Sequence, residues 1–255
     1  MVADRIEHPQ SEMAKYTAVS RGLMSSEINS NPAARRDEKI FTAAFLVCAA
    51  PFFLNDFSNI FVKDWRVWLL IDYSCVKLFP LLVVIYLLRR GVARPSDFGL
   101  TAQRAAPFAA TFFAMVVVGT VMDQNLLSLF RSILGGAHLG GMPEITSGAW
   151  NWIDLTFGLL MVGVFEELVF RGMAHAVLSR RGLKPAAIVA VSAVIFGLIH
   201  WSSGVHAFFN TALIGAVFML FYLRTRSLPA LMLAHFMIDF IAFAGVIPDR
   251  WFKII

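Results

Sequence analysis

Six residues that could do chemistry lie inside strongly apolar stretches of the second half of the chain. Two adjacent glutamates stand in the segment VFEELVFRG, residues 164–172, and an arginine follows the second glutamate four positions later. Because an ionisable side chain inside a membrane helix costs roughly 2.5–3.5 kcal/mol on insertion scales, each such residue is a functional hypothesis by default. The six residues are Glu166, Glu167, Arg171, His200, His235 and Asp239.

Helical spacing assigns different partners to the two glutamates. Residues four apart share one face of an α-helix, so Glu167 and Arg171 are predicted to form an ion pair. Glu166 lies about 100° further round the helix and is left without that partner. His235 and Asp239 are also four apart and share a face. The spacing therefore predicts a supported Glu167 and a Glu166 that is free to act.

The elements that must position these residues are membrane helices. The chain has 255 residues, of which 58% are hydrophobic and only 15% are charged, whereas soluble domains have roughly 25% charged residues. The net charge is +5, and the basic residues lie beside apolar stretches rather than in patches interleaved with aromatic residues. This distribution favours membrane topology over nucleic-acid binding. Cys48 and Cys75 lie inside apolar stretches, so we expect small core residues and no cysteine-based site.

Seven stretches are long and apolar enough to be membrane helices, for which about 20 residues are needed. The sequence therefore predicts an all-α polytopic membrane bundle with its active site within the bilayer. A further segment, 125–134, could be an eighth, interfacial helix. The predicted spans are 40–57, 65–88, 105–122, 152–178, 185–200, 206–223 and 228–247.

Four regions of different character follow along the chain. Residues 1–39 are polar and have no apolar core like that of a signal peptide, so we expect a disordered cytoplasmic tail. Residues 40–122 are predicted to form N-terminal membrane helices. Residues 123–149 contain several glycines and are interpreted as an outer loop or an interfacial segment. Residues 150–247 hold all six polar residues and are predicted to be the catalytic core.

The basic residues predict the orientation of the chain. With seven spans, four basic clusters fall on one side of the membrane, and the opposite loops are nearly free of lysine and arginine. By the positive-inside rule the N-terminus is then cytoplasmic, in what we expect to be a bacterial cytoplasmic membrane. The clusters are Arg35–Arg36–Lys39, Arg89–Arg90–Arg94, Arg180–Arg181–Lys184 and Arg224–Arg226.

Counting helix rise from these basic ends places Glu166, His200, His235 and Asp239 at similar depths, roughly 14–24 Å into the membrane. A carboxylate and two imidazoles that converge from three helices can activate a water molecule. The same residues could also form a proton relay, so a proton- or ion-coupled transporter is an alternative function. A non-catalytic immunity or scaffold protein is a further alternative, although a scaffold gains nothing from buried charges.

The order of three short motifs resembles a known family. EELVFR (166–171), FGLIH (196–200) and HFMID (235–239) resemble the Glu-Glu-x-x-x-Arg, Phe-x-x-x-His and His-x-x-x-Asn/Asp motifs of the CPBP, or Abi, family of intramembrane proteases. That family includes the CAAX endopeptidases and bacteriocin-processing or immunity proteins. The resemblance covers about residues 150–245. It implies a membrane-associated protein or peptide substrate within a lipid bilayer and no nucleic acid, and it leaves the oligomeric state open.

The resemblance also implies a role for each motif residue. Glu166 would be the general base and would act with His200, while Glu167 and Arg171 would support it. His235 and Asp239 would polarise the scissile carbonyl or stabilise the oxyanion. Many relatives have asparagine at the last position, and Asp239 can donate a hydrogen bond only when it is protonated. It could therefore orient His235 or bind a metal instead.

Two points stay open at the level of sequence. Glu166, His200 and His235 supply the ligand types of a catalytic zinc site, but the chain has no His-Glu-x-x-His helix, and a metal-free glutamate mechanism uses the same residues. Asp72 and Lys77, in the second predicted span, are five positions apart and so are not an ideal α-helical pair. They could line the cavity or contact other helices.

Overall fold

The computed structural model describes residues 31–248 and 251–254, and this part of the chain contains helices and loops but no strand. Most of the tail predicted for residues 1–39 lies outside the described residues. Its last part is not a tail, because the first described helix, α2 (Pro32–Phe61), already begins at Pro32. The Asn31 side chain accepts a hydrogen bond from the Ala33 amide at 3.0 Å and caps this helix. Proline at the first helical position favours the same start.

Seven helical rods make up the described bundle, and two of them are continuous helices with π-helical segments. The first composite rod is α3 (Trp65–Asp72), η1 (Tyr73–Leu78) and α4 (Phe79–Arg89). The second is α6 (Gly148–Ile153), η3 (Asp154–Gly158), α7 (Leu159–Glu167), η4 (Leu168–Met173) and α8 (Ala174–Arg180). The other rods are α2, α5 (Ala105–Leu134), α9 (Pro185–Leu198), α10 (Val205–Thr225) and α11 (Leu228–Ala244).

Four of these helices are long and apolar enough to cross a membrane by themselves: Pro32–Phe61, Trp65–Arg89, Ala105–Leu134 and Val205–Thr225. Pro185–Leu198 and Leu228–Ala244 are shorter apolar helices. The prediction of an all-α polytopic helical bundle is thus confirmed. One boundary is wrong: the third span does not end at Met122 but continues to Leu134, so 125–134 is not a separate interfacial helix. The helix ends at Gly135, which has a positive φ of 84°.

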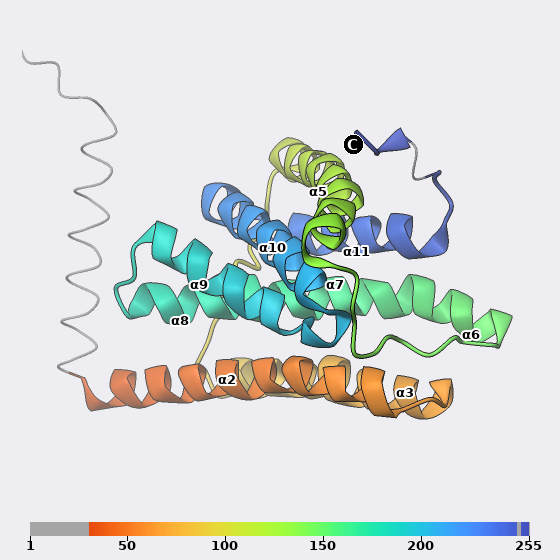
Figure 1. Ribbon diagram of the computed structural model, residues 1–255. Coiled ribbons are helices and arrows are strands. Elements are labelled where there is room, and N and C mark those ends of the chain that lie inside the picture. Colours follow the sequence, from red (N-terminus) through yellow and green to blue (C-terminus); the bar gives the residue numbers. More distant parts are fainter. Residues whose placement is uncertain (1–30, 249–250, 255) are drawn as a thin grey trace, which may run out of the picture.

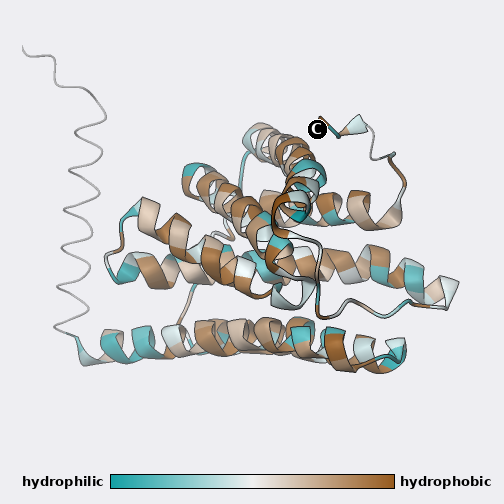
Figure 2. Cartoon of the chain, in the orientation of Figure 1, coloured by the Kyte–Doolittle hydropathy of each residue, from teal (hydrophilic) through white to brown (hydrophobic). Residues whose placement is uncertain are grey.

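The rods pack in layers around the second composite helix. Helix α2 lies beside α3 along one side of the bundle, below the α6–α8 rod, as Figure 1 shows. On the other side α11 packs against α7, and α5 packs against both α10 and α11. Helix α9 packs against α10 and returns along α8. Apolar residues surround most rods rather than forming one stripe (Figure 2), as expected of helices that face both a core and lipid.

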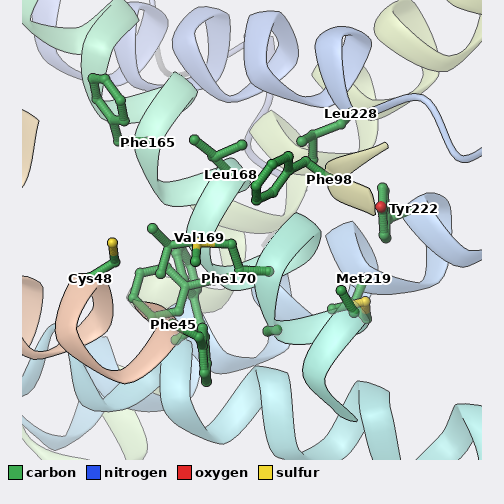
Figure 3. Close-up of a cluster of buried hydrophobic side chains, with 14 of the residues drawn as sticks. Phe45, Cys48, Phe98, Phe165, Leu168, Val169, Phe170, Met219, Tyr222 and Leu228 are labelled. Atoms are coloured by element: carbon green, nitrogen blue, oxygen red, sulfur yellow. The ribbon is translucent and has the colours of Figure 1, made fainter. Parts of the chain in front are cut away.

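A buried apolar core joins α2, the α7–η4–α8 rod and α10. Figure 3 shows Phe45 and Cys48 of α2 next to Val169 and Phe170 of η4. Cys48 is fully buried, which agrees with its prediction as a small core residue, but Cys75 is exposed. Cys75 lies in η1, on the side of the helix that is not covered by other helices. Among the described residues, large apolar side chains such as Leu46, Leu54 and Phe113 are exposed, as a lipid-facing surface requires.

The π-helical segments change which residues are neighbours. In a π-helix the backbone hydrogen bonds join residues five apart, and such turns occur frequently at functional sites. Segment η1 begins directly after Asp72 and contains Lys77. The two side chains, which an α-helical spacing would separate, form a buried ion pair here. The interpretation of Asp72 and Lys77 as a poor pair is therefore wrong, because it assumed a regular α-helix.

Candidate active site

Glu167 and Arg171 form the most deeply buried ion pair of the described chain. Both side chains are 0% exposed, and Arg171 Nη1 lies 3.1 Å from Glu167 Oε1. The predicted pairing is confirmed. The guanidinium also lies over the aromatic rings of Phe196 and Phe218, at 4.0 and 5.0 Å from their centroids. Its nitrogens make no aligned hydrogen bond within the described residues, so the pair rests on charge and on cation–π contact.

His235 of α11 links this pair to the other carboxylates. Its Nδ1 lies 2.8 Å from Glu167 Oε1, so the Nδ1–H donates to that carboxylate. Its Nε2 lies 3.4 Å from Asp239 Oδ2 and 3.7 Å from Glu166 Oε2. The predicted shared face of His235 and Asp239 is therefore observed. Glu167 holds Arg171 on one side and His235 on the other, which fixes the orientation of the imidazole.

The close approach of α7 and α11 brings these groups together. Gly163 of α7 faces the backbone of α11, and a Cβ added there would lie 2.7 Å from the carbonyl oxygen of Met232. Only a residue without a side chain therefore allows this helix contact. The contact places the glutamates at the end of α7 against the face of α11 that carries His235.

Glu166 differs from its neighbour in having no hydrogen-bond partner at one oxygen. The residue is 8% exposed. Its Oε2 has no hydrogen bond to any described residue, although His235 Nε2 is within ion-pair distance. The side chain lines a cavity of about 680 Å³. The free Glu166 expected from the spacing is thus seen in the geometry, and this carboxylate faces a space large enough for water and a peptide segment.

His200 reaches the same cavity from a turn rather than from a helix. The sequence predicted that the fifth span reaches His200, but α9 ends at Leu198. The Nδ1–H of His200 donates to the Phe196 carbonyl oxygen at 3.0 Å. This bond assigns the lone pair of the neutral ring to Nε2. The Phe196 ring also contacts the His200 ring at 5.2 Å and the His235 ring at 6.2 Å. Phe196 therefore separates the two histidines and supports both.

The turn that carries His200 is held by α2, a contact that the sequence did not reveal. The Asp56 carboxylate accepts a hydrogen bond from the Ser202 amide at 2.7 Å. The Trp201 indole nitrogen donates to the Phe53 carbonyl oxygen at 3.0 Å. The signal that could have indicated Asp56 is that it is an acidic residue at the end of an apolar stretch, like the residues of the second half.

The cavity brings together four of the six predicted site residues: Glu166, His200, His235 and Asp239. Glu167 lies behind His235, and Arg171 lines a smaller adjoining pocket together with His200, His235 and Asp239. Asp72 and Lys77 line the cavity, one of the two placements that the sequence left open for them. The wall also includes residues of α2, η3 and α5 that the sequence did not indicate. The arrangement offers a carboxylate with an unpartnered oxygen and two oriented imidazoles to a cavity lined by both polar and apolar side chains.

The donor types of this site suit zinc, but their arrangement does not. Both histidines donate their Nδ1–H to an oxygen, a pattern that commonly orients zinc-binding imidazoles. However, no group of three or more His, Cys, Asp or Glu side chains in the described part of the chain is placed to hold a metal ion. Glu166, His200 and His235 therefore do not form a ligand set as they stand.

Comparisons with known proteins identify the segment that contains all these motifs. Residues 148–241 match the family model described as type II CAAX prenyl endopeptidase Rce1-like. This match confirms the resemblance to the CPBP family that the three motifs indicated. It spans the second composite helix, α9, α10 and most of α11, whereas α2 to α5 lie outside it. The comparisons with curated proteins and with solved structures found no match.

Proposed function

We propose that this chain, with its Rce1-like segment, is an intramembrane endopeptidase that hydrolyses a peptide bond of a membrane-associated protein or peptide. The observation that carries the proposal is Glu166. It is a buried carboxylate with one oxygen unpartnered, 3.7 Å from His235 Nε2, and it lines the same cavity as His200. A charge of this kind is costly in a membrane unless it has a function.

In the proposed reaction, Glu166 and the unprotonated Nε2 of His200 hold a water molecule in the cavity. Glu166 takes a proton from this water as the oxygen attacks the carbonyl carbon of the scissile peptide bond. A tetrahedral intermediate forms. The carbon–nitrogen bond then breaks, and the proton held by Glu166 passes to the leaving nitrogen. The products are a new carboxyl terminus and a new amino terminus.

His235 is assigned to stabilising the oxyanion of this intermediate. When both ring nitrogens carry a proton, Nδ1–H donates to Glu167, and Nε2–H faces Asp239 on the cavity side, where the oxyanion would replace Asp239 as its acceptor. Preorganised donors aimed at a developing oxyanion commonly contribute several kcal/mol to catalysis, roughly 3–4 kcal/mol in known cases. Arg171 offsets the charge of Glu167, so that this carboxylate orients the ring without adding an unpaired charge to the site.

Asp239 is assigned to positioning rather than to donating a hydrogen bond. An ionised carboxylate only accepts hydrogen bonds, and its Oδ2 already lies 3.4 Å from His235 Nε2. It therefore keeps the ring turned towards Glu166. This assignment explains how aspartate can stand where the family motif also allows asparagine.

The substrate and the orientation are part of the proposal. The family description suggests a CAAX-type prenylated substrate, and the CPBP resemblance adds bacteriocin-like peptides. By the positive-inside rule the basic clusters favour a cytoplasmic N-terminus, and we assign the chain to a bacterial cytoplasmic membrane. The segment 123–149 is interpreted as an outer segment, and its residues Arg131, Gly141 and Met142 belong to the cavity wall. The cavity would therefore open on the side of the membrane opposite the cytoplasm. In this assignment 40–122 supplies the supporting helices and 150–247 the catalytic core.

The direct test is cleavage of a membrane-anchored peptide library, with and without a prenyl group, by the full-length protein in liposomes. Glu166→Gln removes the base and is expected to lower the cleavage rate roughly 10²–10⁴-fold. Glu144→Gln is the matched control, because Glu144 is an exposed residue of the loop before α6. Thermal unfolding of each variant shows whether it is folded.

Two outcomes would contradict the protease assignment. One is a folded Glu166→Gln protein that cleaves at the unchanged rate. The other is proton flux across the liposomes, driven by an added solute, from a protein that cleaves none of the peptides. The second outcome would favour the transporter alternative, since buried carboxylates and histidines also form proton relays.

A further inference from the structure

The wall of the cavity carries a second cluster of polar side chains besides the motif residues. It is built by the end of α3, by η1 and by η3, which come from two different rods. The Tyr73 hydroxyl donates to Asp154 Oδ1 at 3.1 Å. Lys77 pairs with Asp72, and its ammonium lies 4.3 Å from the centre of the Tyr73 ring. The cluster therefore joins the two rods through polar contacts, and Asp72, Lys77 and Asp154 line the same cavity as Glu166.

Glycine is needed where this cluster meets the second composite helix. A Cβ added to Gly158 would collide with the Asp154 carboxylate and would lie 2.7 Å from the Tyr73 hydroxyl oxygen. The chain thus leaves room at this position for the Tyr73–Asp154 contact. The contact is a specific feature of this wall.

Acidic side chains outnumber basic ones in the cavity wall. Six carboxyl groups line it, against three lysine or arginine side chains and two histidines, of which His235 is assigned a positive charge in the proposed reaction. Two of those three cations, Arg131 and Lys253, are exposed and therefore solvated, whereas Lys77 is buried and already paired. A cationic segment would be stabilised in such a space, and an anionic segment would be repelled. The carboxylates are Asp56, Asp72, Asp123, Asp154, Glu166 and Asp239.

Asp154 has the acceptor capacity that a cation would need. Asp72 is held by Lys77 and Asn55, and Asp56 accepts from Ser202 and Asn59. Asp154, by contrast, is half-buried and accepts a single hydrogen bond within the described residues, from Tyr73. With Asp72 and Lys77 it forms a group of two carboxylates and one ammonium. Within this group Lys77 is paired with Asp72, and Asp154 has no ion-pair partner among the described residues.

We propose that Asp154 forms a specificity subsite that receives a lysine or arginine side chain of the substrate, with Tyr73 and the Asp72–Lys77 pair holding its carboxylate in place. This inference rests on the proposed protease function and adds a substrate preference to it. Asp154 and Glu166 are twelve residues apart on one composite helix, or about 18 Å at α-helical rise. An extended peptide covers about 3.3 Å per residue, so the basic residue lies roughly three to six residues from the scissile bond once the reach of its own side chain is included.

The experiment separates binding from cleavage. Full-length Glu166→Gln protein in detergent micelles is titrated with membrane-anchored peptides that carry lysine, norleucine or glutamate at one position. Norleucine matches the length of the lysine stem without its charge. We expect the lysine peptide to bind about tenfold more tightly than the norleucine peptide, as a charge-assisted hydrogen bond would give, and the glutamate peptide to bind more weakly than both.

Two further variants locate the preference. Adding Asp154→Asn is expected to bring the lysine-to-norleucine ratio close to one, and Asp154→Lys is expected to make the glutamate peptide the preferred ligand. Adding Glu144→Gln, on the exposed loop, leaves the ratio at about ten. A lysine preference that survives Asp154→Asn would overturn the assignment of the subsite. If the Asp154 variants do not fold, equal affinity of the unmodified site for lysine and norleucine peptides still overturns it.

Failure of this inference can be told apart from failure of the protease assignment. If the protein with Glu166 intact cleaves peptides but neither cleavage nor binding depends on a basic residue, the subsite is wrong and the protease function stands. If nothing is cleaved but lysine peptides bind through Asp154, the subsite stands as a binding site, and the hydrolytic function is wrong.

Discussion

Two buried ion pairs near the cavity resemble each other in chemistry and differ in their surroundings. Glu167 and Arg171 are fully buried, and the guanidinium lies between two aromatic rings. Asp72 and Lys77 are also buried, but both line the 680 Å³ cavity, and Asn55 approaches Asp72 from α2. The first pair is thus closed within protein, whereas the second faces a space that water or a substrate can enter.

The difference shows what each pair can do. A charge that water cannot reach must keep its partner, because removal of one partner leaves an uncompensated buried charge. Glu167 is therefore suited to hold His235 in one fixed position. A charge beside a cavity can exchange partners with water or with a ligand, so the Asp72–Lys77 pair is suited to a wall that contacts the substrate.

The largest effect is expected from breaking the closed pair. Arg171→Met removes the positive charge and leaves Glu167 buried beside His235. We expect a loss of about 3–5 kcal/mol in the free energy of unfolding, the usual cost of breaking one side of a buried pair. Cleavage is expected to fall with it, because Glu167 without its counterion would no longer fix the orientation of His235. Thermal unfolding in detergent and the liposome cleavage assay measure the two effects.

The matched control for this change is Arg180→Met. Arg180 forms a partly exposed ion pair with Asp97, at 3.2 Å, near the end of α8. Partly exposed pairs contribute about 1 kcal/mol or less, so this variant is expected to unfold close to the wild-type temperature. Equal losses of unfolding free energy for Arg171→Met and Arg180→Met would show that the full burial of the Glu167–Arg171 pair makes no difference to stability.

A smaller effect is expected from breaking the pair that faces the cavity. Asp72→Asn leaves the Lys77 ammonium beside water and beside Asp154, so the loss in unfolding free energy should be about 1–3 kcal/mol. The double variant Asp72→Asn/Lys77→Met removes both charges and should recover part of this loss. A double-mutant cycle built from unfolding measurements gives the coupling energy directly. A coupling as large as that of Glu167 with Arg171 would contradict the distinction between the two pairs.

The same two pairs show how far the sequence could predict this structure. Helical spacing correctly paired Glu167 with Arg171 and correctly placed His235 and Asp239 on one face, because the members of each pair are four positions apart. The hydropathy of the chain likewise predicted the polytopic helical bundle. The Asp72–Lys77 pair could not be predicted, because the residue spacing does not indicate that the backbone changes from an α-helix to a π-helix after Asp72.

Contacts between distant segments were also beyond the sequence. The hydrogen bond from the Ser202 amide to Asp56 joins residues 146 positions apart, and the bond from Tyr73 to Asp154 joins residues 81 apart. A residue list can indicate that such acids are costly in apolar stretches, but it cannot choose their partners. The turn at His200 was missed for a similar reason: α9 ends at Leu198, and the following segment is held by a contact with α2 rather than by its own helical pattern.

The smallest effect is expected from a change beside the cavity pair that removes no charge. Tyr73→Phe deletes the hydroxyl that donates to Asp154 and keeps the ring that faces Lys77. Because the Asp154 carboxylate reaches the cavity and can accept a hydrogen bond from water instead, the loss in unfolding free energy should be about 1 kcal/mol or less. The preference for lysine over norleucine peptides should fall more clearly, since Asp154 would no longer be held in one position.

Phe157, which contacts the Tyr73 ring from the other rod, offers the control Phe157→Leu, which alters packing at the same place without removing a hydrogen bond. If Phe157→Leu lowers the lysine preference as much as Tyr73→Phe does, the wall acts through packing alone, and the hydroxyl has no role in positioning Asp154.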